Sequence, residues 1–402
     1  MKKLTVEDLD LKGKRVLMRV DFNVPLEAGK VANDKRIRAA IPTIKYIVEK
    51  GGKLILMSHL GRPKGVRVAE MSLKPCVSVL EQLLGQPIGF IDDCIGEKVT
   101  AAVEKLQGGD VLLLENLRYY KQETDNDPDF ARQLARLGDL YVNDAFGTAH
   151  RAHASTKGVT HFFDLCAAGF LMTKELDYLG RAMENPEKPL VAILGGAKIS
   201  GKIDVITNLL PKVDRVIIGG GMSYTFFKAQ GLEIGNSLLE ADRVDVARQI
   251  LATGADKIVL PVDCMVSDAF DFKARKIGKL KQVNADAIPA GWTALDIGSK
   301  SIEAFAAILK GAKTVIWNGP MGVFEIEQTA RGTDAIANIL AEITAAGAIT
   351  VIGGGDSAAA VNKAGVADRV SHVSTGGGAS LEFIEGKTLP GVAALTDNLN
   401  VA

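Results

Sequence analysis

Cysteine is scarce in this sequence, and the few cysteines lie far apart. The four of them, Cys76, Cys94, Cys166 and Cys264, form no CxxC pair. This spacing excludes a zinc knuckle and a disulfide scaffold. It is typical of a protein in a reducing compartment, so we expect a cytoplasmic location.

Long apolar runs and an excess of one charge are also missing. No stretch of about 18 uncharged apolar residues occurs, as a membrane-spanning helix would need. Charged residues interrupt the N-terminal segment MKKLTVEDLDLKGKR before any apolar core of a signal peptide, so no export is expected. The 48 basic and 48 acidic residues give a formal net charge of zero. We therefore expect neither a nucleic acid nor a membrane as a partner, and any basic site must be local.

What the sequence does contain is the balance of an ordinary globular protein, with 47% apolar and 24% charged residues. Its 402 residues suggest two domains, at roughly 100 to 200 residues each. Short runs rich in leucine and β-branched residues alternate with longer helical stretches, as in a parallel sheet with crossover helices. The runs fall at 15–20, 53–58, 110–115 and 140–144 in the first half, and at 190–194, 215–218, 257–260, 314–317, 349–352 and 369–373 in the second. The fold class is α/β, with two parallel-sheet domains.

A helix is predicted between the two halves, in the segment GFLMTKELDYLGRAMENPEKP. Apolar residues recur on one of its faces, and two prolines follow it. These are Met172, Leu176, Leu179 and Met183, then Pro186 and Pro189. A semi-rigid connector between domains and an ordinary crossover helix within one sheet both fit this pattern. As a connector it gives domains at 1–168 and 189–388, with the linker at 169–188.

In the second half, strand after strand runs directly into glycine. The segments read LVAIL-GGAK, RVII-GGGM, TVIW-NGPMG, ITVI-GGGDS and RVSHVST-GGGAS. Glycine lets the backbone approach a ligand closely, and a helix that begins there directs unpaired N–H groups at an anion. In open α/β sheets the ligand site lies at the carboxyl ends of the strands. Tight turns alone could explain one such glycine, but five together predict an anion cradle.

Two segments match familiar nucleotide-binding motifs only in part. GAKISGK at 196–202 has Walker A spacing, yet Ile203 stands where the Mg²⁺-binding Ser or Thr would be. GGGDSA at 353–358 fits GxGxxA, but the acidic residue expected about 20 positions later is missing. Neither an ordinary P-loop nor a dinucleotide site is predicted.

In the first half, polar side chains suited to an anion follow the predicted strands. Arginine recognises phosphate and carboxylate bidentately, and several separate loops each offer one. The residues are Asp21, Asn23, Arg36, Arg38, His59, Arg62, Arg118, His150 and Arg151. Any single arginine could be a solvated surface charge, but the repetition predicts a site for an anionic metabolite. His150 and His153 have the spacing of a metal pair without a third ligand, so we favour phosphate contact.

Taken together, the motifs VDFNVP, SHLGRP, ENLR, NDAFGTAHRAHAS, GGAK, WNGPMGVFE, GGGDS and STGGGAS closely resemble those of phosphoglycerate kinase, in order and over nearly the whole chain. The resemblance implies two Rossmann-like domains joined by a helix, with a C-terminal tail at 389–402 that returns to the first domain. It implies reversible phosphoryl transfer from 1,3-bisphosphoglycerate to Mg-ADP, giving 3-phosphoglycerate and ATP. A monomer that closes about a hinge is the expected form.

The resemblance also assigns the site residues. For the glycerate substrate it implies Asp21, Asn23, Arg36, His59, Leu60, Gly61, Arg62, Arg118 and Arg151. For the nucleotide it implies Lys198, Lys202, Asn318, Glu325, Gly354, Gly355, Asp356, Ser357 and Gly376, with Asp356 acting through Mg²⁺. The catalytic group would be Arg36, Lys198, Lys202, Gly354 and Gly377. Helix N-termini after Gly354 and Gly376 would supply N–H donors.

Two positions depart from the family pattern. Gly201 stands where a larger, often polar residue is usual, and Ser357 replaces the usual threonine. Neither change removes a phosphate ligand, although Gly201 could loosen the loop that holds Lys202. A catalytically silent sensor of nucleotide or phosphoglycerate and an NAD-dependent dehydrogenase are the alternatives. Retention of Arg36, Lys198, Lys202 and Asp356 favours the kinase over the first. Nicotinamide-cofactor binding would test the second.

Overall fold

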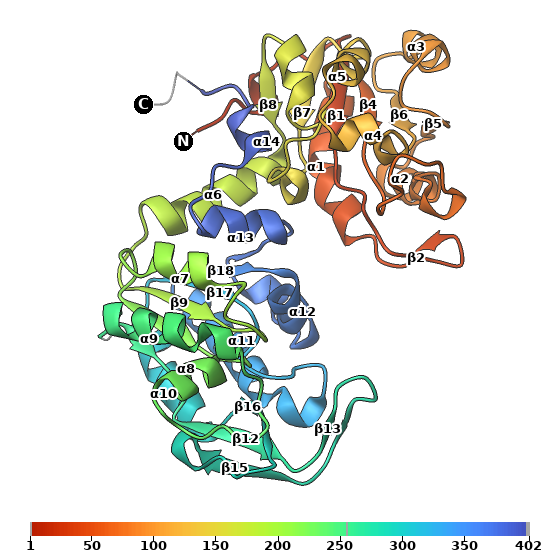
Figure 1. Cartoon of the computed structure of the whole chain (residues 1–402). Helices are drawn as coiled ribbons and strands as arrows, with labels where there is room; N and C mark the ends of the chain where they lie inside the picture. Colours follow the sequence, from red (N-terminus) through yellow and green to blue (C-terminus); the bar gives the residue numbers. More distant parts are fainter. Residues whose placement is uncertain (1, 255, 399–402) are drawn as a thin grey trace. The chain divides into compact units, whose positions relative to one another are not determined.

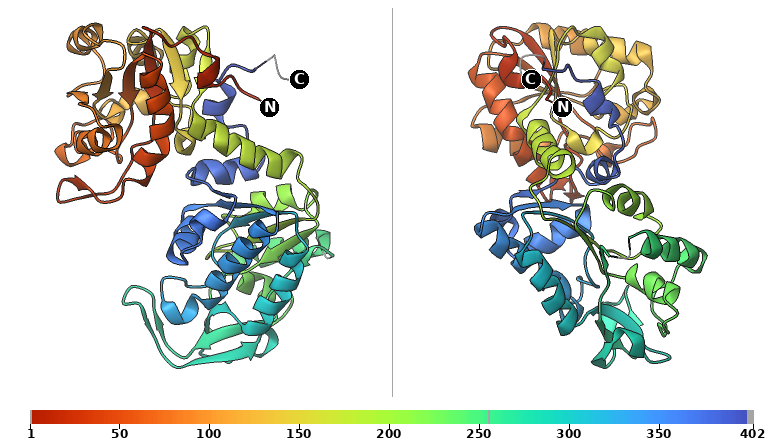
Figure 2. Two further views of the ribbon diagram at one scale, coloured as in Figure 1. Left: turned by 180° about the vertical axis from the view of Figure 1, so that it is seen from behind. Right: turned by 90° about the vertical axis from the view of Figure 1, so that its left-hand side faces the viewer.

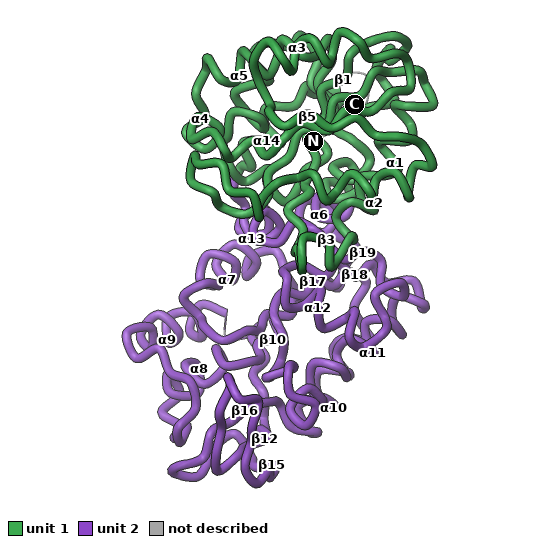
Figure 3. Tube along the Cα trace, turned by 90° about the vertical axis from the view of Figure 1, so that its right-hand side faces the viewer, with its two compact units in different colours: residues 1–177, 388–402 green, residues 178–387 purple. Residues whose placement is uncertain are grey.

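The computed structural model describes residues 2–254 and 256–398 of the chain, which form two compact units (Figures 1 and 3). Unit 1 contains residues 1–177 and 388–402, and unit 2 contains residues 178–387. The boundary lies inside helix α6 (Phe170–Glu184), between Asp177 and Tyr178. The last four residues of the predicted tail, 399–402, lie outside the described part.

Unit 1 is built on a six-stranded parallel sheet, in the order β5-β6-β4-β1-β7-β8. Its central strands are buried almost throughout, because crossover helices cover both faces of a parallel sheet. The strands are β1 (Arg15–Arg19), β4 (Lys53–Met57), β5 (Gly89–Ile91), β6 (Val111–Leu114), β7 (Leu140–Asn143) and β8 (Cys166–Ala168). A short hairpin of β2 (Leu26–Glu27) and β3 (Lys30–Val31) completes the β structure described for this unit.

Besides the part of α6 that it contains, unit 1 has one long helix and several shorter ones. They are α1 (Lys35–Glu49), α2 (Cys76–Leu84), α3 (Glu97–Glu104), α4 (Lys121–Thr124), α5 (Pro128–Ala135) and α14 (Pro390–Ala393). Helix α14 comes from the end of the chain, yet Figure 2 shows it beside the elements of unit 1 in both views. The Gly391 N–H donates to the Ala149 carbonyl at 2.8 Å, and the Leu4 N–H donates to the Thr396 carbonyl at 2.8 Å. The C-terminal segment is thus fastened to the N-terminal unit by backbone hydrogen bonds.

Unit 2 is built on a second six-stranded parallel sheet, in the order β11-β10-β9-β17-β18-β19. Its strands are β9 (Leu190–Leu194), β10 (Arg215–Ile218), β11 (Ile258–Val259), β17 (Thr314–Asn318), β18 (Ile349–Gly353) and β19 (His372–Val373). Its helices are α7 (Ile203–Leu209), α8 (Ser223–Ala229), α9 (Val244–Thr253), α10 (Ser299–Lys310), α11 (Arg331–Ala345), α12 (Gly355–Lys363) and α13 (Gly378–Ile384). All ten strands predicted from the sequence lie in one of the two parallel sheets, so the α/β prediction is confirmed.

An additional antiparallel sheet in unit 2 was not predicted. It has the order β15-β12-β16, formed by β12 (Asp263–Ser267), β15 (Leu280–Asn284) and β16 (Thr293–Ile297). A hairpin of β13 (Phe270–Asp271) and β14 (Lys276–Ile277) leaves it. Strand β15 is mostly exposed and carries few large apolar residues, so it lacks the continuous apolar signal of the parallel strands. Strands β12 and β16 are mostly buried, but their segments DCMVS and TALDI carry polar residues and lack the continuous apolar runs that the sequence analysis relied on.

Candidate functional site

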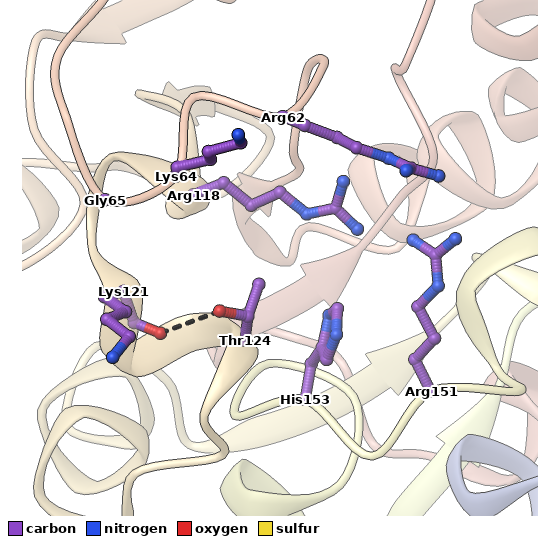
Figure 4. A pocket seen from close by; sticks show the side chains of 8 residues that line it. All are labelled: Arg62, Lys64, Gly65, Arg118, Lys121, Thr124, Arg151 and His153. Atoms are coloured by element: carbon purple, nitrogen blue, oxygen red, sulfur yellow. Dashed lines mark hydrogen bonds between the residues drawn. The ribbon is translucent and has the colours of Figure 1, made fainter.

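A cavity of about 530 Å³ in unit 1 has a strongly basic wall. Figure 4 shows Arg62, Arg118 and Arg151 extending towards the same open space from three separate segments. None of the residues that the structure places on this wall is acidic, so their charge is available to attract an anion. The wall consists of Arg62, Lys64, Gly65, Arg118, Lys121, Thr124, Arg151 and His153.

Arg118 is held in place by its neighbours in the motif ENLR. The Asn116 side chain accepts a hydrogen bond from the Arg118 N–H at 3.1 Å and donates to the Leu60 carbonyl at 2.7 Å. The Arg118 guanidinium donates to the Gly61 carbonyl at 2.8 Å. Burial, together with the charges of Arg19 and Arg151, lowers the pKa of Arg118 to about 10. The group still carries its charge at neutral pH, so the anion-binding prediction is chemically sound here.

A second cluster in unit 1 joins Asp21, Asn23 and Arg36. The Arg36 guanidinium donates to both carboxylate oxygens of Asp21, at 3.1 and 3.0 Å, and to the Asn23 carbonyl at 3.1 Å. The Asn23 side chain in turn accepts from the Gly61 N–H at 2.9 Å. Asn23 therefore links this cluster to the loop that carries Gly61 and Arg62. These three residues do not line the basic cavity itself.

Two histidines beside the cavity are held neutral by their surroundings. Burial, then the charges of Arg19, Arg118, Arg151 and Arg36, lowers the pKa of His59 well below its ordinary value. Burial and the arginines also lower the pKa of His153 to about 3, although its Nδ1 lies 3.8 Å from Oε1 of the buried Glu123. At that distance the Glu123 carboxylate raises the pKa of His153 by less than burial and the nearby cations lower it. His153 is therefore a neutral imidazole at physiological pH.

The structure thus brings Arg62, Arg118 and Arg151 to one cavity and places Asp21, Asn23 and Arg36 in a linked cluster. Leu60 and Gly61 contribute their backbone carbonyl groups. The Leu60 carbonyl accepts a hydrogen bond from Asn116, and the Gly61 carbonyl accepts one from Arg118. Arg38 instead pairs with Asp34 at 2.8 Å on the exposed side of α1. The wall residues Lys64, Lys121 and Thr124 were missed, because single lysines and threonines in loops carry no distinguishing signal.

In unit 2, the glycine-rich turns meet at one edge of the parallel sheet, as the shared strand direction requires. A Cβ atom on Gly195 would lie 2.1 Å from the Pro320 carbonyl oxygen, and one on Gly319 would lie 2.2 Å from the Gly195 carbonyl oxygen. Only glycine permits this approach of the turns after β9 and β17. The Ser357 hydroxyl accepts from the Gly319 N–H at 2.6 Å, which ties helix α12 to the same turn.

These turns enclose a cavity of about 330 Å³ with a backbone-rich wall. Gly354 has a φ of 87° and directly precedes α12. The N–H groups of the first turn of α12, which have no partner within the helix, therefore lie at this wall. The wall contains Gly195, Gly196, Ala197, Lys198, Lys202, Asn318, Gly319, Gly354, Gly355, Asp356, Ser357, Gly377, Gly378 and Leu381. Gly376 is buried, and α13 begins at Gly378, one residue later than expected. Glycine backbone, a helix N-terminus and two lysines form an arrangement suited to phosphates.

Lys202 is the more buried of the two lysines. Its ammonium group donates to the side-chain oxygen of Asn318. Burial lowers its pKa to about 8, and the carboxylates of Glu385 and Asp356 partly oppose that shift. Lys202 is therefore charged at neutral pH but close to titration, and its cation is directed into the cavity region by Asn318.

A larger cavity of about 880 Å³ adjoins the first, since Gly196, Ala197 and Asp356 line both. Glu325 lines this larger cavity. Its apolar wall was missed by the sequence analysis, because it combines residues from several elements far apart in the chain. These are Tyr224, Leu238, Leu239, Phe270, Phe272, Leu295, Val323 and Phe324. An apolar cavity beside a phosphate-binding one has the character of a nucleotide site.

Within the described part of the chain, no group of three or more His, Cys, Asp or Glu residues is arranged to hold a metal ion by itself. The HRAH segment accordingly forms no metal cluster there. Asp356, at the first turn of α12, is the carboxylate common to both cavities of unit 2. Mg²⁺ in phosphoryl-transfer sites is commonly held by one or two carboxylates together with substrate phosphates. One carboxylate at this junction fits that mode of binding.

The fold and these cavities define an α/β protein with a basic cavity in one unit and, in the other, a glycine-rich cavity beside an apolar one. Comparisons with known proteins agree with this class. The family model described as Phosphoglycerate kinase matches residues 6–387. A protein named Phosphoglycerate kinase from Rippkaea orientalis is 58% identical over 391 residues, which cover 96% of this chain and 97% of that protein. A cytosolic phosphoglycerate kinase from Triticum aestivum is 58% identical over 98% of each chain.

A solved structure of phosphoglycerate kinase from Coxiella burnetii has a TM-score of 0.89, at 41% identity, and covers 98% of each chain. The chain therefore belongs to the phosphoglycerate kinase family. This confirms the predicted activity, that of an ATP-binding glycolytic kinase and phosphotransferase with a carboxyl group as acceptor. No helix in the described residues is both long enough and apolar enough to cross a membrane.

Proposed function

We propose that the basic cavity of unit 1 binds 3-phosphoglycerate or 1,3-bisphosphoglycerate, and that the adjoining cavities of unit 2 bind ATP or ADP. The observation that carries this proposal is the separation of two chemically different sites, one basic and one glycine-rich with an apolar extension. Arg62, Arg118 and Arg151 would hold the glycerate anion. Asp21, Asn23, His59, Leu60 and Gly61 would shape its surroundings.

On the nucleotide side, Lys198 and Lys202 would neutralise phosphate charge, and Asn318 would orient Lys202. Backbone N–H groups at Gly354, Gly355 and Ser357 would donate to phosphate oxygens at the start of α12. Glu325 would accept from the ribose, and the apolar wall of the larger cavity would cover the base. Asp356 would hold nucleotide-bound Mg²⁺, which supplies charge neutralisation between phosphate oxygens when bound. Gly376 and Gly377 would complete the turn behind the phosphates.

The reaction follows from these positions. In the ATP-consuming direction, a carboxylate oxygen of 3-phosphoglycerate bonds to the γ-phosphorus as the bond from that phosphorus to the bridging oxygen breaks, and ADP leaves. The attacking carboxylate is already ionised at neutral pH, so no general base is needed. Arg36, Lys198 and Lys202 would stabilise the charge on the transferring group, which is the main requirement of such a transition state. The transfer is direct, without a covalent enzyme intermediate.

One chain contains both sites, which supports a monomer as the working form. All four cysteines are buried and unpaired, as expected in a reducing cytoplasm. A coupled assay of the purified protein with 3-phosphoglycerate and Mg-ATP, following acyl phosphate, tests the activity. Formation that depends on both substrates supports the kinase, whereas binding of either substrate without turnover would point to the silent sensor. Light scattering of the active protein gives the oligomeric state.

A further inference from the structure

A network of buried polar side chains lies behind the basic cavity and is absent from the predicted site. Arg19, on β1, is fully buried, and so are Glu123 and Ser155. The Arg19 Nε–H donates to the Ser155 hydroxyl oxygen at 2.8 Å. That hydroxyl donates to Glu123 Oε1 at 2.6 Å, and the Ser155 N–H donates to Glu123 Oε2 at 2.9 Å. A buried cation and a buried anion are thus joined through one hydroxyl group.

The network ends on His59. Arg19 Nη2 lies 3.1 Å from Nδ1 of His59, which is only 2% exposed. Guanidinium groups donate hydrogen bonds and cannot accept them. Nδ1 must therefore be the acceptor, and it carries no proton. Since an imidazole ring has two nitrogens, the proton of the neutral ring resides on Nε2.

We propose that Arg19 is a positioning residue that fixes His59 as the neutral Nε2–H tautomer, so that His59 acts as a hydrogen-bond donor to the bound anion and not as a cation. Among the described residues, the structure gives Nε2 of His59 no hydrogen-bond partner, which leaves this N–H for a ligand oxygen. The Glu123–Ser155 pair holds Arg19 in the required orientation. That the ligand is the glycerate substrate rests on the proposed function; the tautomer itself does not.

The charges around His59 act in the same direction. Arg19 approaches from β1, Arg36 from α1, Arg118 from the loop after β6, and Arg151 from the loop after β7. Protonation of His59 would add a further cation to these four and would place an N–H against an Arg19 N–H. A neutral ring avoids the charge repulsion and the opposed N–H groups, and it still donates one directed hydrogen bond. Binding of an anion through His59 should therefore not depend on pH in the range where a free histidine titrates.

Nitrogen NMR of the ¹⁵N-histidine-labelled wild-type protein tests the tautomer directly. We expect the His59 ring to show an unprotonated Nδ1 and a protonated Nε2 throughout pH 5.5–8, with or without 3-phosphoglycerate. An Nδ1–H ring, or a doubly protonated ring at pH 6, would overturn the proposal even if the enzyme proved fully active. The exposed His161 provides an internal reference signal.

Substitutions of His59 then show whether it acts on the anion as a neutral hydrogen-bond donor or as a cation. His59→Gln keeps a neutral N–H donor near the Nε2 position, whereas His59→Leu removes it. We expect KM for 3-phosphoglycerate to rise by less than about threefold in His59→Gln, and by about tenfold or more in His59→Leu, as expected for loss of a hydrogen bond to a charged group. Equal, large losses in both variants would show that the cation matters. His161→Gln is the matched control and should leave KM unchanged.

Arg19→Gln tests the positioning residue itself. Without the guanidinium, Nδ1 of His59 loses the donor that keeps a proton off it, so ¹⁵N spectra of the variant should show Nδ1–H rings beside Nε2–H rings, and KM for 3-phosphoglycerate should rise. An Arg19→Gln protein with the wild-type tautomer and an unchanged KM would contradict the role of Arg19. Should this variant fail to fold, the NMR result on the wild-type protein still decides the tautomer.

Discussion

The guanidinium Nη1 of Arg36 lies 3.0 Å from Oδ2 of Asp21, so the predicted catalytic arginine is held by a carboxylate of the same unit. The Arg36 side chain is 39% exposed and that of Asp21 only 11%. Nη1 is bound to the protein, and the side chain as a whole stays partly exposed. Asp21 thus orients a cation without burying it.

Arg36→Ala should lower kcat by about 10²-fold or more, because a cation on the transferring group acts mainly in the transition state. Steady-state kinetics of the folded variant give the answer. Arg38→Ala is the matched control on the same helix, since Arg38 pairs with Asp34, and should leave kcat unchanged. A raised KM at normal kcat would make Arg36 a substrate anchor instead.

Lys202→Ala should lower kcat by about 10²-fold, because a neutral side chain cannot replace the charge beside the phosphates. In the wild type, the pKa of about 8 predicts that KM for Mg-ATP rises as the pH passes above 8, where Lys202 loses its proton. Gly201→Thr is the neighbouring control. A Cβ at Gly201 would meet no atom within 4 Å, so this change should keep activity and alter stability by less than about 0.5 kcal/mol. Wild-type activity in Lys202→Ala would remove this loop from the mechanism.

His153 should make the protein less stable in acid. Its pKa is about 3 in the folded protein against an ordinary value of 6.5, so only the unfolded chain takes up this proton between those values. The contribution is therefore present above pH 6.5 and is lost as the pH falls towards 3. Urea unfolding of His153→Gln at pH 7 and pH 5 should show a smaller loss of stability than the wild type. His161→Gln, at an exposed position, should lose as much stability between pH 7 and pH 5 as the wild type does. An equal loss of unfolding free energy in all three proteins would refute the expectation.

Asp296 should make the protein less stable as the pH rises, the opposite of the effect of His153. Burial raises its pKa to about 7 from 3.8, although the N–H groups of Gly332 and Ile297 donate to its carboxylate. The folded protein keeps this proton between pH 3.8 and 7 while the unfolded chain has released it, so stability falls as the pH rises through that window. Asp296→Asn should therefore gain stability relative to the wild type between pH 5 and pH 7.5. Asp286→Asn, an exposed change, controls for net charge; an equal gain there would leave Asp296 without this role.

Domain closure is expected to accompany the reaction. The residues proposed to bind the glycerate lie in unit 1 and those proposed to bind the nucleotide lie in unit 2, yet reacting atoms must come within about 3 to 3.5 Å. We place the hinge in the segment 169–189, with a second flexure at 374–377. Each ligand alone contacts mainly one unit and should shift the closed population only partly. Small-angle scattering should give the smallest radius of gyration with 3-phosphoglycerate and Mg-nucleotide together. The same radius in every state of an active sample would rule out closure.

Much of this molecule was determined by the sequence alone. Ten of the twelve strands in the two parallel sheets were predictable, because such strands are buried on both faces and are rich in apolar residues; the three-residue strands β5 and β8 were missed. The glycine-lined cavity of unit 2 was predictable, because close backbone approach requires glycine, and glycines stand directly after β9, β17 and β18. Arg62, Arg118 and Arg151 were predictable from their positions after strands. Each of these features depends on residue type within a short segment.

Only the tertiary structure decided the rest. Strand order and the antiparallel sheet of unit 2 depend on pairings between distant segments, and a half-exposed strand such as β15 has no continuous apolar signal. The apolar wall of the larger cavity combines side chains as distant as Tyr224 and Phe324. Nothing in the sequence pattern indicates that Arg19 and Glu123 belong to one buried network. Folding buries both around Ser155 and points Arg19 at His59, because the desolvation of a buried charge must be offset by partners that only the folded chain brings together.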